Sequence, residues 1–267
     1  MPELPEVETV RAGLSRSWIG RTIEYVELRR EGLRFPFPEN LDSELTGRRI
    51  EGIRRRAKYL QIDLDDGRIL LSHLGMSGRW TLDASTSEGK HDHVVLHLDD
   101  GSISVYNDAR RFGMLDLYEG ESHRLLDHLG PEPLGEWDAQ QLHEKLNRRR
   151  SPVKIAILDQ KVVVGVGNIY VCEALNRCGI SPTRLACEIT IEECGTLVSE
   201  IKKILAEAIQ AGGSTLKDFA AVDGTLGYFP HQFRVYGKEG DPCDCGGIVE
   251  RIPQGGRSTF WCPSCQT

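Results

Sequence analysis

The sequence predicts an α+β protein in which an N-terminal helix and an antiparallel β-sandwich precede a helical domain and a short C-terminal hairpin. Apolar residues at helical spacing open the chain, and alternating apolar patterns bounded by turn residues follow. Residues 130–135 read Gly-Pro-Glu-Pro-Leu-Gly, and helical patterns replace strand patterns after this break. We therefore predict domains over residues 1–134, 135–235 and 236–267.

The first helix and the strands of the sandwich are predicted from local sequence patterns. Val7, Val10 and Leu14 recur at spacings of three and four after Pro5, which is typical of an amphipathic helix. Asp-Asp-Gly occurs at residues 65–67 and again at 99–101, each time between apolar runs, and predicts two hairpins. Alternation predicts strands at Ile23, Val26, Leu28, Ile62, Leu64, Ile69 and Leu71. Residues 83–90 have the composition of a surface loop.

Three helices are predicted in the middle domain. The first has Ser151 as its N-cap and Pro152 at its first position. The second begins at Asn168 and ends at Gly179. The third begins with a capping box of Thr190 and Glu193 and stops at residues 212–213, both glycine. Its predicted buried face contains Cys194, Leu197, Val198, Ile201, Leu205 and Ala208.

Composition excludes several classes of protein. The chain has 267 residues, a formal net charge of −7 and 39% hydrophobic residues, which excludes extensive disorder. By total charge alone no affinity for nucleic acid is expected. No apolar run is long enough to span a bilayer, and the acidic, Pro-containing N-terminus is unlike a secretory signal. We therefore expect a cytoplasmic protein without membrane partners.

Four cysteines near the C-terminus predict a structural zinc site. Cys243 and Cys245 form one pair, and Cys262 and Cys265 form a second pair with the usual two-residue spacing. The single residue between the first two sulfurs departs from the usual spacing, and four free thiols are the alternative interpretation. A site with four protein ligands leaves no open position, so one zinc ion per chain is expected to stabilise the fold and not to catalyse.

The remaining cysteines and a group of histidines are weaker candidates for metal binding. The gaps between Cys172, Cys178, Cys187 and Cys194 include no tight pair, so we interpret these residues as small core residues and an iron–sulfur cluster as the alternative. His91, His93 and His97 alternate along a predicted strand without supporting carboxylates or cysteines. A surface or contact role for His91 is favoured over metal binding.

Positive charge is concentrated in two segments. Residues 48–58 and 145–161 each carry a local charge of about +5 and are either solvated faces or the two sides of a phosphate-binding cleft. Residues 165–168, Gly-Val-Gly-Asn, precede and begin a predicted helix, whose exposed backbone N–H groups and positive dipole end form a further candidate phosphate-binding site. Removal of Met1 would expose the secondary amine of Pro2, which titrates near ~7.7 to 8.0 and can attack a carbon electrophile, with Glu3 and Glu6 beside it.

Taken in order, several motifs resemble those of the formamidopyrimidine-DNA glycosylase family over essentially the whole chain. They are Met-Pro-Glu-Leu-Pro-Glu at 1–6, Arg-Ala-Lys-Tyr-Leu at 56–60, His-Leu-Gly-Met-Ser-Gly at 73–78, Lys-His-Asp-His at 90–93, Arg-Arg-Phe-Gly at 110–113, Val-Gly-Val-Gly-Asn-Ile-Tyr at 164–170 and Gly-Gly-Ser-Thr-Leu-Lys-Asp-Phe at 212–219. The resemblance implies a bifunctional glycosylase and AP lyase of base excision repair, with a helix–two-turn–helix module in its helical domain. It also implies a monomer that acts on double-stranded DNA containing oxidised purines.

The same resemblance implies roles for individual residues. Pro2 is similar to the family nucleophile that forms a Schiff base, and Glu3 is similar to its general acid. Lys58 and Arg257 match the proton donors of β- and δ-elimination. Positions similar to DNA contacts are His91, Arg110, Arg149 and Asn168, and the residues similar to those that fill the gap left by an everted nucleotide are Met76, Arg110 and Phe112. The Cys-Asp-Cys spacing departs from the family and bears on the placement of Arg257.

Three alternatives stay open at this stage. An endonuclease VIII-like enzyme would share the chemistry and act on oxidised pyrimidines, although Leu4 and residues 227–229, Gly-Tyr-Phe, are more similar to the purine-specific branch. A non-catalytic zinc-ribbon protein would tolerate Pro2→Ala and leave damaged strands intact. An iron–sulfur glycosylase would absorb visible light.

Overall fold

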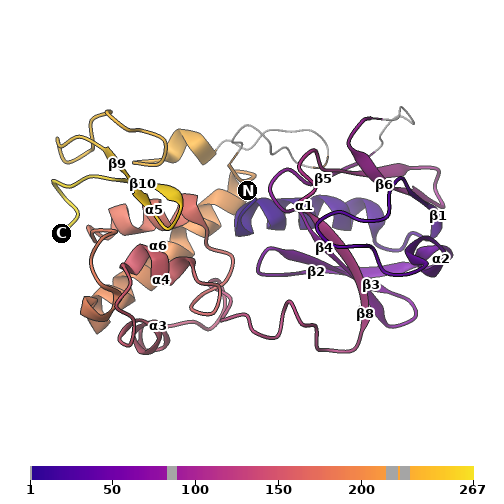
Figure 1. The fold of residues 1–267 in the computed structure, drawn as a ribbon, viewed down its shortest axis with the longest axis horizontal. Helices are drawn as coiled ribbons and strands as arrows, with labels where there is room; N and C mark the ends of the chain where they lie inside the picture. The colour runs from indigo at the N-terminus through magenta and orange to yellow at the C-terminus, as the bar shows by residue number, and fades with distance from the viewer. Residues whose placement is uncertain (1, 83–88, 215–221, 223–228) are drawn as a thin grey trace. The chain divides into compact units, whose positions relative to one another are not determined.

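The computed structural model describes residues 2–82, 89–214, 222 and 229–267. Its backbone forms two compact units, each made of two separate stretches of chain (Figure 1). Unit 1 comprises Met1–Asp127 and Ala211–Tyr228, and unit 2 comprises His128–Gln210 and Phe229–Thr267. The three-domain division at residues 134 and 235 stays a prediction.

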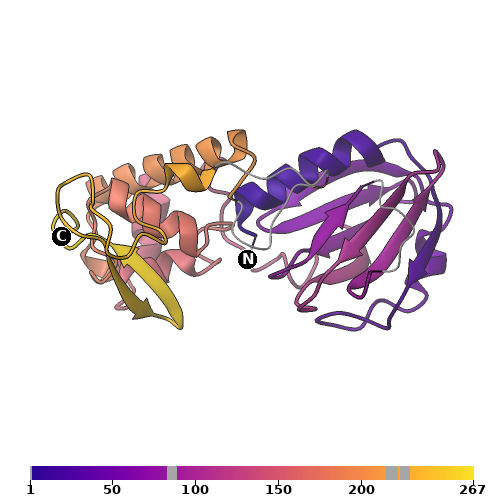
Figure 2. The same cartoon turned by 90° about the horizontal axis from the view of Figure 1, so that it is seen from above.

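Unit 1 is a β-sandwich accompanied by a long helix, which confirms the predicted fold class. Helix α1 spans Leu4–Trp18 and the short helix α2 spans Leu41–Leu45. Two four-stranded sheets have the orders β1-β6-β7-β5 and β2-β3-β4-β8, and neighbouring strands pair antiparallel. The strand bounds are β1 Ile23–Leu28, β2 Ile50–Arg56, β3 Tyr59–Leu64, β4 Arg68–His73, β5 Arg79–Thr81, β6 Asp92–Leu98, β7 Ile103–Asn107 and β8 Met114–Glu119. Figure 2 shows α1 lying alongside the strands of this unit.

The apolar face of α1 belongs to the core of the sandwich, as its spacing predicts. Val7, Val10 and Leu14 are at most 1% exposed and pack in one cluster with residues of both sheets. Trp18 is also fully buried, and its indole N–H donates to Ser104 Oγ at 2.9 Å, so the one polar atom of the ring is satisfied. This packing fixes the helix, and with it the N-terminus of the chain, against the sheets.

Both predicted Asp-Asp-Gly hairpins are confirmed. The first joins β3 to β4 and the second joins β6 to β7. Gly67 and Gly101 have φ angles of 84° and 80°, a left-handed conformation that closes a hairpin turn and favours glycine. The predicted surface loop lies largely outside the described residues, since residues 83–88 are among those not described.

Unit 2 is helical and ends in a two-stranded hairpin. Its elements are α3 Ala139–Leu146, α4 Val153–Leu158, α5 Asn168–Arg177, α6 Ile191–Gln210, two short 3-10 helices at Ala186–Glu188 and Phe229–Gln232, and the antiparallel strands β9 Glu250–Gln254 and β10 Arg257–Trp261. The capping box of α6 is confirmed, because Thr190 N–H donates to Glu193 Oε2 at 2.9 Å and Glu193 N–H donates to Thr190 Oγ1 at 3.3 Å. Pro152, and not Ser151, occupies the N-cap position of α4. The helix starts one residue later than predicted because Pro152 has a ψ of 143°, which is outside the helical range.

In the part of the chain that the structure describes, every helix is too short or too polar to cross a bilayer.

Candidate active site and metal centre

The N-terminal segment is held by a buried carboxylate on the first turn of α1. Glu6 is 2% exposed, and its Oε2 accepts the backbone N–H of Glu3 at 2.8 Å. Its Oε1 accepts both the N–H and the hydroxyl of Ser214, at 2.7 and 2.8 Å. Pro2 and Glu3 are buried as well. Glu6 therefore fixes the position of the predicted nucleophile and of the predicted general acid through the backbone between them.

Lys58 lies on the turn between β2 and β3, and Arg55 joins this turn to α1. The Arg55 guanidinium donates to Glu8 Oε2 on α1 at 2.9 Å and to the Ala57 carbonyl at 3.0 Å. Ala57 has a φ of 53°, a conformation that costs a non-glycine residue about 1 kcal/mol or more. Lys58 is 7% exposed. The turn that carries the predicted lysine is thus strained and clamped to the helix that carries Pro2.

His73, at the end of β4, adds a neutral hydrogen-bond donor near Lys58. Burial lowers the pKa of His73 to about 4, and the positive charges of Lys58 and Arg34 contribute in the same direction. Its Nδ1 accepts the N–H of Gly75 at 3.0 Å, which leaves the proton of the neutral ring on Nε2. Burial also raises the pKa of the adjacent Tyr59, whose ring centroid lies 4.7 Å from that of His73. His73 opens a motif in the sequence, but its lowered pKa was not predicted, because a histidine at a strand end carries no local signal for its burial.

The predicted gap-filling residues lie on two loops of unit 1. Met76 is half-buried in the loop after β4, and Arg110 and Phe112 are exposed in the loop before β8. The Arg110 guanidinium lies 4.9 Å from the centre of the Phe112 ring, a cation–π contact. Phe112 is 45% exposed, so its ring is not part of the core. His91 is half-buried and immediately precedes β6.

Asn168 and Arg149 lie in unit 2. Asn168 begins α5, and Gly165 in the loop before it has a φ of 77°. The Asn168 side chain donates through Nδ2 to the Ser258 carbonyl of β10 at 2.9 Å, and its buried Oδ1 lacks a hydrogen-bond partner. Arg149 donates to Asp159 Oδ2 at 2.8 Å. Both side chains are therefore oriented by protein partners, and their contacts with DNA stay predictions.

Arg257 is exposed at the tip of the C-terminal hairpin. Gly255 and Gly256, which form the two-residue turn before it, have φ angles of 56° and 72°, the conformation of a type I′ turn. Behind the tip, the fully buried Lys154 of α4 donates to Thr259 Oγ1 at 2.5 Å, and Thr259 donates to Gln254 Oε1 at 2.9 Å. The first bond fixes β10 to α4, and the second joins the two strands of the hairpin.

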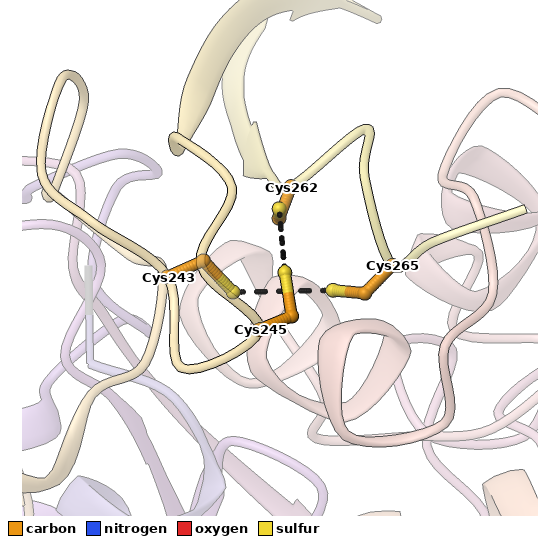
Figure 3. A group of neighbouring side chains, drawn as sticks. All are labelled: Cys243, Cys245, Cys262 and Cys265. Carbon is orange, nitrogen blue, oxygen red and sulfur yellow. Dashed lines mark hydrogen bonds between the residues drawn. The ribbon is translucent and has the colours of Figure 1, made fainter.

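The four C-terminal cysteines converge on one point, as Figure 3 shows. Their sulfur atoms all lie within 4.8 Å of one another, with 3.9 Å between Cys243 and Cys265 and 3.5 Å between Cys245 and Cys262. A tetrahedral zinc ion with Zn–S bonds of about 2.3 Å places sulfurs about 3.8 Å apart, so this group fits the metal. The short Cys243–Cys245 spacing is accommodated because Cys243 N–H donates to the Gly247 carbonyl at 2.8 Å and closes the loop.

The other candidate metal ligands are not assembled. Among the described residues, the four C-terminal cysteines are the one group of three or more potential ligands that gathers in this way. Cys172 and Cys194 are core residues as predicted, whereas Cys187 is exposed and the prediction for it was wrong. Burial raises the pKa of Cys178 to about 12, which keeps that thiol protonated. His93 donates through Nε2 to the Asp108 carbonyl at 2.8 Å, and His97 Nε2 lies 2.8 Å from Glu27 Oε1.

The basic segment at residues 48–58 is substantially neutralised by acidic residues from elsewhere in unit 1. Arg54 pairs with Asp63 on the neighbouring strand, and Arg55 pairs with Glu8 on α1. Arg48 lies 3.6 Å from Asp66. A charge count along the sequence therefore overestimates the positive field of this segment, because its counter-charges are distant in the sequence.

Comparisons with known proteins agree with the motifs. Three family models match: the formamidopyrimidine-DNA glycosylase N-terminal domain over residues 1–115, the formamidopyrimidine-DNA glycosylase H2TH domain over residues 129–220, and the zinc finger found in FPG and IleRS over residues 240–267. The chain is 51% identical to the formamidopyrimidine-DNA glycosylases of Ruegeria pomeroyi and Rhizorhabdus wittichii, with 100% of both chains covered in each case.

Solved structures give the same result. A mutant Lactococcus lactis FPG in complex with a Fapy-dG containing DNA is 36% identical, with a TM-score of 0.93 and 100% of both chains covered. The Lactococcus lactis Fpg bound to DNA with an abasic site is also 36% identical, with a TM-score of 0.92 and 99% of both chains covered. A sandwich, an H2TH domain and a four-cysteine finger in this order define a DNA glycosylase. The chain belongs to the formamidopyrimidine-DNA glycosylase family.

Proposed function

We propose that this chain is a bifunctional glycosylase and AP lyase that excises 8-oxoguanine and formamidopyrimidines from double-stranded DNA. The proposal is carried by the buried N-terminal segment, in which Glu6 holds the backbone of Glu3 at 2.8 Å and thereby fixes Pro2. Sequence identity of 50–51% over the full length of formamidopyrimidine-DNA glycosylases supports the same assignment.

The reaction begins at the secondary amine of Pro2, exposed once Met1 is removed. The amine nitrogen attacks C1′ of the damaged nucleotide, the bond from C1′ to the base breaks, and the base leaves with a proton. Glu3 serves as the general acid that moves protons at the sugar. Water is restricted around both residues by their burial, which strengthens the interaction of the Glu3 carboxyl with the reacting sugar.

Two eliminations then cleave the strand. The C1′–O4′ bond of the sugar then opens as O4′ takes a proton, which leaves an iminium ion between Pro2 and C1′. This iminium ion acidifies the C2′ hydrogen, and loss of that proton breaks the C3′–O bond and expels the 3′ phosphate in β-elimination. Lys58 supplies positive charge and a proton donor on the strained turn beside His73. A second elimination expels the 5′ phosphate, for which Arg257 on the exposed hairpin tip is the proposed donor. Because His73 is neutral and carries its proton on Nε2, it donates a hydrogen bond to phosphate without competing for the protons that move in these steps.

The DNA contacts and the metal complete the proposal. We assign His91, Arg110, Arg149 and Asn168 to the DNA, and Met76, Arg110 and Phe112 to the space left by the everted nucleotide. One structural zinc ion is held by the four cysteine sulfurs, whose separations fit its coordination. The zinc holds the hairpin in shape and supplies no reaction chemistry, since four protein ligands leave no open coordination position.

Borohydride trapping tests the proposal. The protein is incubated with a duplex containing 8-oxoguanine opposite cytosine, reduced, and digested for mass spectrometry, and we expect a DNA-linked peptide that begins at Pro2. The control is the same chain with an uncleaved N-terminal extension, in which a peptide bond blocks the Pro2 nitrogen. A cross-link at any other residue, equal trapping by the blocked chain, or trapping only on thymine glycol would contradict the proposal.

A further inference from the structure

Two loops of unit 1 lie backbone against backbone. Residues 74–78 join β4 to β5, and residues 108–113 join β7 to β8. Gly75 has a φ of 62°, and a Cβ atom there would lie 2.3 Å from the carbonyl carbon of Phe112 and 2.4 Å from the nitrogen of Gly113. The two loops are therefore in direct contact at a point where only glycine fits.

A buried ionisable side chain joins these loops. Asp108 is fully buried, and its Oδ1 accepts the hydroxyl of Ser77 at 2.6 Å and the N–H of Arg110 at 3.2 Å. Its Oδ2 accepts the N–H of Gly113 at 2.8 Å. The Ser77 oxygen itself accepts the Arg110 N–H at 3.0 Å. Ser77 and Asp108 thus form a pair whose hydrogen bonds reach both loops, and we name it the Ser77–Asp108 latch.

The backbone of Asp108 is anchored from behind. Its N–H donates to the His91 carbonyl at 3.0 Å, and its carbonyl lies 2.8 Å from His93 Nε2. Tyr106 lies in β7, which ends just before Asp108, and its hydroxyl donates to the His73 carbonyl at the end of β4 at 2.9 Å. Burial raises the pKa of Tyr106 well above its usual value, and the negative charge of Asp108 adds to this effect. The carboxylate of the latch therefore occupies one position set by the sandwich core.

The latch carries the three predicted gap-filling side chains. Met76 immediately precedes Ser77, while Arg110 and Phe112 lie between Asp108 and Gly113. Phe112 is held 45% exposed although burial of a phenylalanine ring in the core stabilises a protein. An exposed apolar ring on a fixed loop is expected to gain its burial from a partner, and stacked bases offer a flat apolar surface of that kind.

We propose that the Ser77–Asp108 latch positions Met76, Arg110 and Phe112 as one preformed wedge, so that the three side chains enter the duplex together. This inference rests on the proposed function. Eversion of a nucleotide already requires that bases be unstacked, and a mobile loop would add the cost of its own ordering. Because the latch orders the loops before DNA binds, it removes the second cost, and Ser77 and Asp108 are positioning residues for nucleotide eversion.

The test compares three variants that differ by one hydroxyl or one methyl group. Ser77→Ala removes the latch hydroxyl, and Ser77→Thr retains it. Ser104→Ala is the matched control, because it also removes a serine hydroxyl that is hydrogen-bonded within the same sandwich, to Trp18, away from the two loops. Each protein is measured for single-turnover excision of 8-oxoguanine from a duplex and for β-elimination at a preformed AP site in a single-stranded oligonucleotide.

Ser77→Ala is expected to lower the duplex excision rate at least about tenfold, the loss expected for a hydrogen bond to a charged group. The fold-loss in the single-strand rate is expected to be smaller than the fold-loss in the duplex rate by a factor of at least about five. Ser77→Thr should restore duplex excision to within about threefold of the wild type. The fluorescence rise of 2-aminopurine beside the lesion, which reports unstacking, should slow in Ser77→Ala by the same factor as excision.

Equal losses on both substrates, or a loss in Ser104→Ala as large as that in Ser77→Ala, would show a general effect on folding and would overturn the latch. No loss in Ser77→Ala would overturn it as well. Asp108→Asn, which keeps the shape and removes one acceptor oxygen, is expected to behave as Ser77→Ala does and not to add to it in the double variant, since both belong to one interaction. A wild-type protein that processes neither substrate would instead refute the proposed function itself.

Discussion

Acidification is expected to leave His73 neutral far below the pH at which an ordinary histidine takes up a proton. Burial, together with the charges of Lys58 and Arg34, lowers the pKa of this imidazole from 6.5 to about 4. Near pH 5.5 an ordinary histidine is roughly 90% protonated, whereas a group with a pKa of about 4 is only roughly 3% protonated. Hydrogen bonds that depend on the neutral ring should therefore persist throughout the range in which free histidine is charged.

The same shift makes the stability of unit 1 depend on pH. Below about pH 6.5 the unfolded chain binds a proton at His73 that the folded protein does not bind, so the contribution is present above that pH and is lost as pH falls toward 4. Lowering the pKa by about 2.5, at about 1.4 kcal/mol for each unit of pH, gives a maximal loss of about 3.5 kcal/mol. His73→Gln removes the titrating group and retains polar atoms, so it should lose about 2.5 kcal/mol less than the wild type between about pH 7.5 and pH 4.5.

Two measurements check this prediction. Long-range ¹H–¹⁵N correlation spectra of the imidazole should show a protonated Nε2 and an unprotonated Nδ1, with no titration above about pH 5. Urea unfolding followed through the amide signals of unit 1 gives the free energy of unfolding at each pH for the wild type and His73→Gln. Burial also lowers the pKa of His93, but this effect is common to both proteins and cancels in the difference. A ring that titrates near pH 6.5, or equal losses of stability in the two proteins, would refute the reasoning.

Three further predictions follow from contacts described above. Arg55→Met releases the turn that carries Lys58, so it should lower the yield of borohydride-trapped complex and lower the free energy of unfolding by about 1–3 kcal/mol. Arg54→Met removes a more exposed ion pair and should lower the free energy of unfolding by less than about 1 kcal/mol. Gly75→Ala should destabilise by more than about 2 kcal/mol in thermal unfolding, whereas Gly101→Ala, with a similar φ and open space around it, should cost about 1 kcal/mol. Removal of metal by a chelator should abolish protection of the β9–β10 amides from hydrogen exchange and leave that of the sandwich unchanged, and equal loss in both would contradict a purely structural zinc site.

Local sequence patterns predicted most of the secondary structure and one complete site. The capping box of α6, the two Asp-Asp-Gly hairpins and the buried face of α1 each depend on residues within a few positions of one another. The four cysteines were also identifiable, because metal ligands occur as close pairs. Their irregular first pair still converges, since a backbone hydrogen bond from Cys243 to Gly247 closes the loop.

The contacts that organise the candidate active site could not be predicted in this way. Glu6 meets Ser214 across 208 positions, and Arg55 meets Glu8 across 47. Asp108 is one of many aspartates, and its burial follows from the approach of two loops that no periodicity relates. Charge counting failed at residues 48–58 for the same reason, because the carboxylates that neutralise the arginines come from other elements. Sequence motifs named the residues that we propose to react, and long-range contacts position them.

The bond between Glu6 and Ser214 also sets an order of events during synthesis. Ser214 and Val222 belong to unit 1 although they follow most of unit 2 in the sequence, and Val222 lies in the sandwich core. A ribosome that has released the whole first stretch of unit 1 has therefore not yet supplied the partner that holds the N-terminal carboxylate. The amine proposed to attack DNA acquires its fixed position only when the chain is nearly finished, so a truncated or nascent chain lacks the assembled reaction centre.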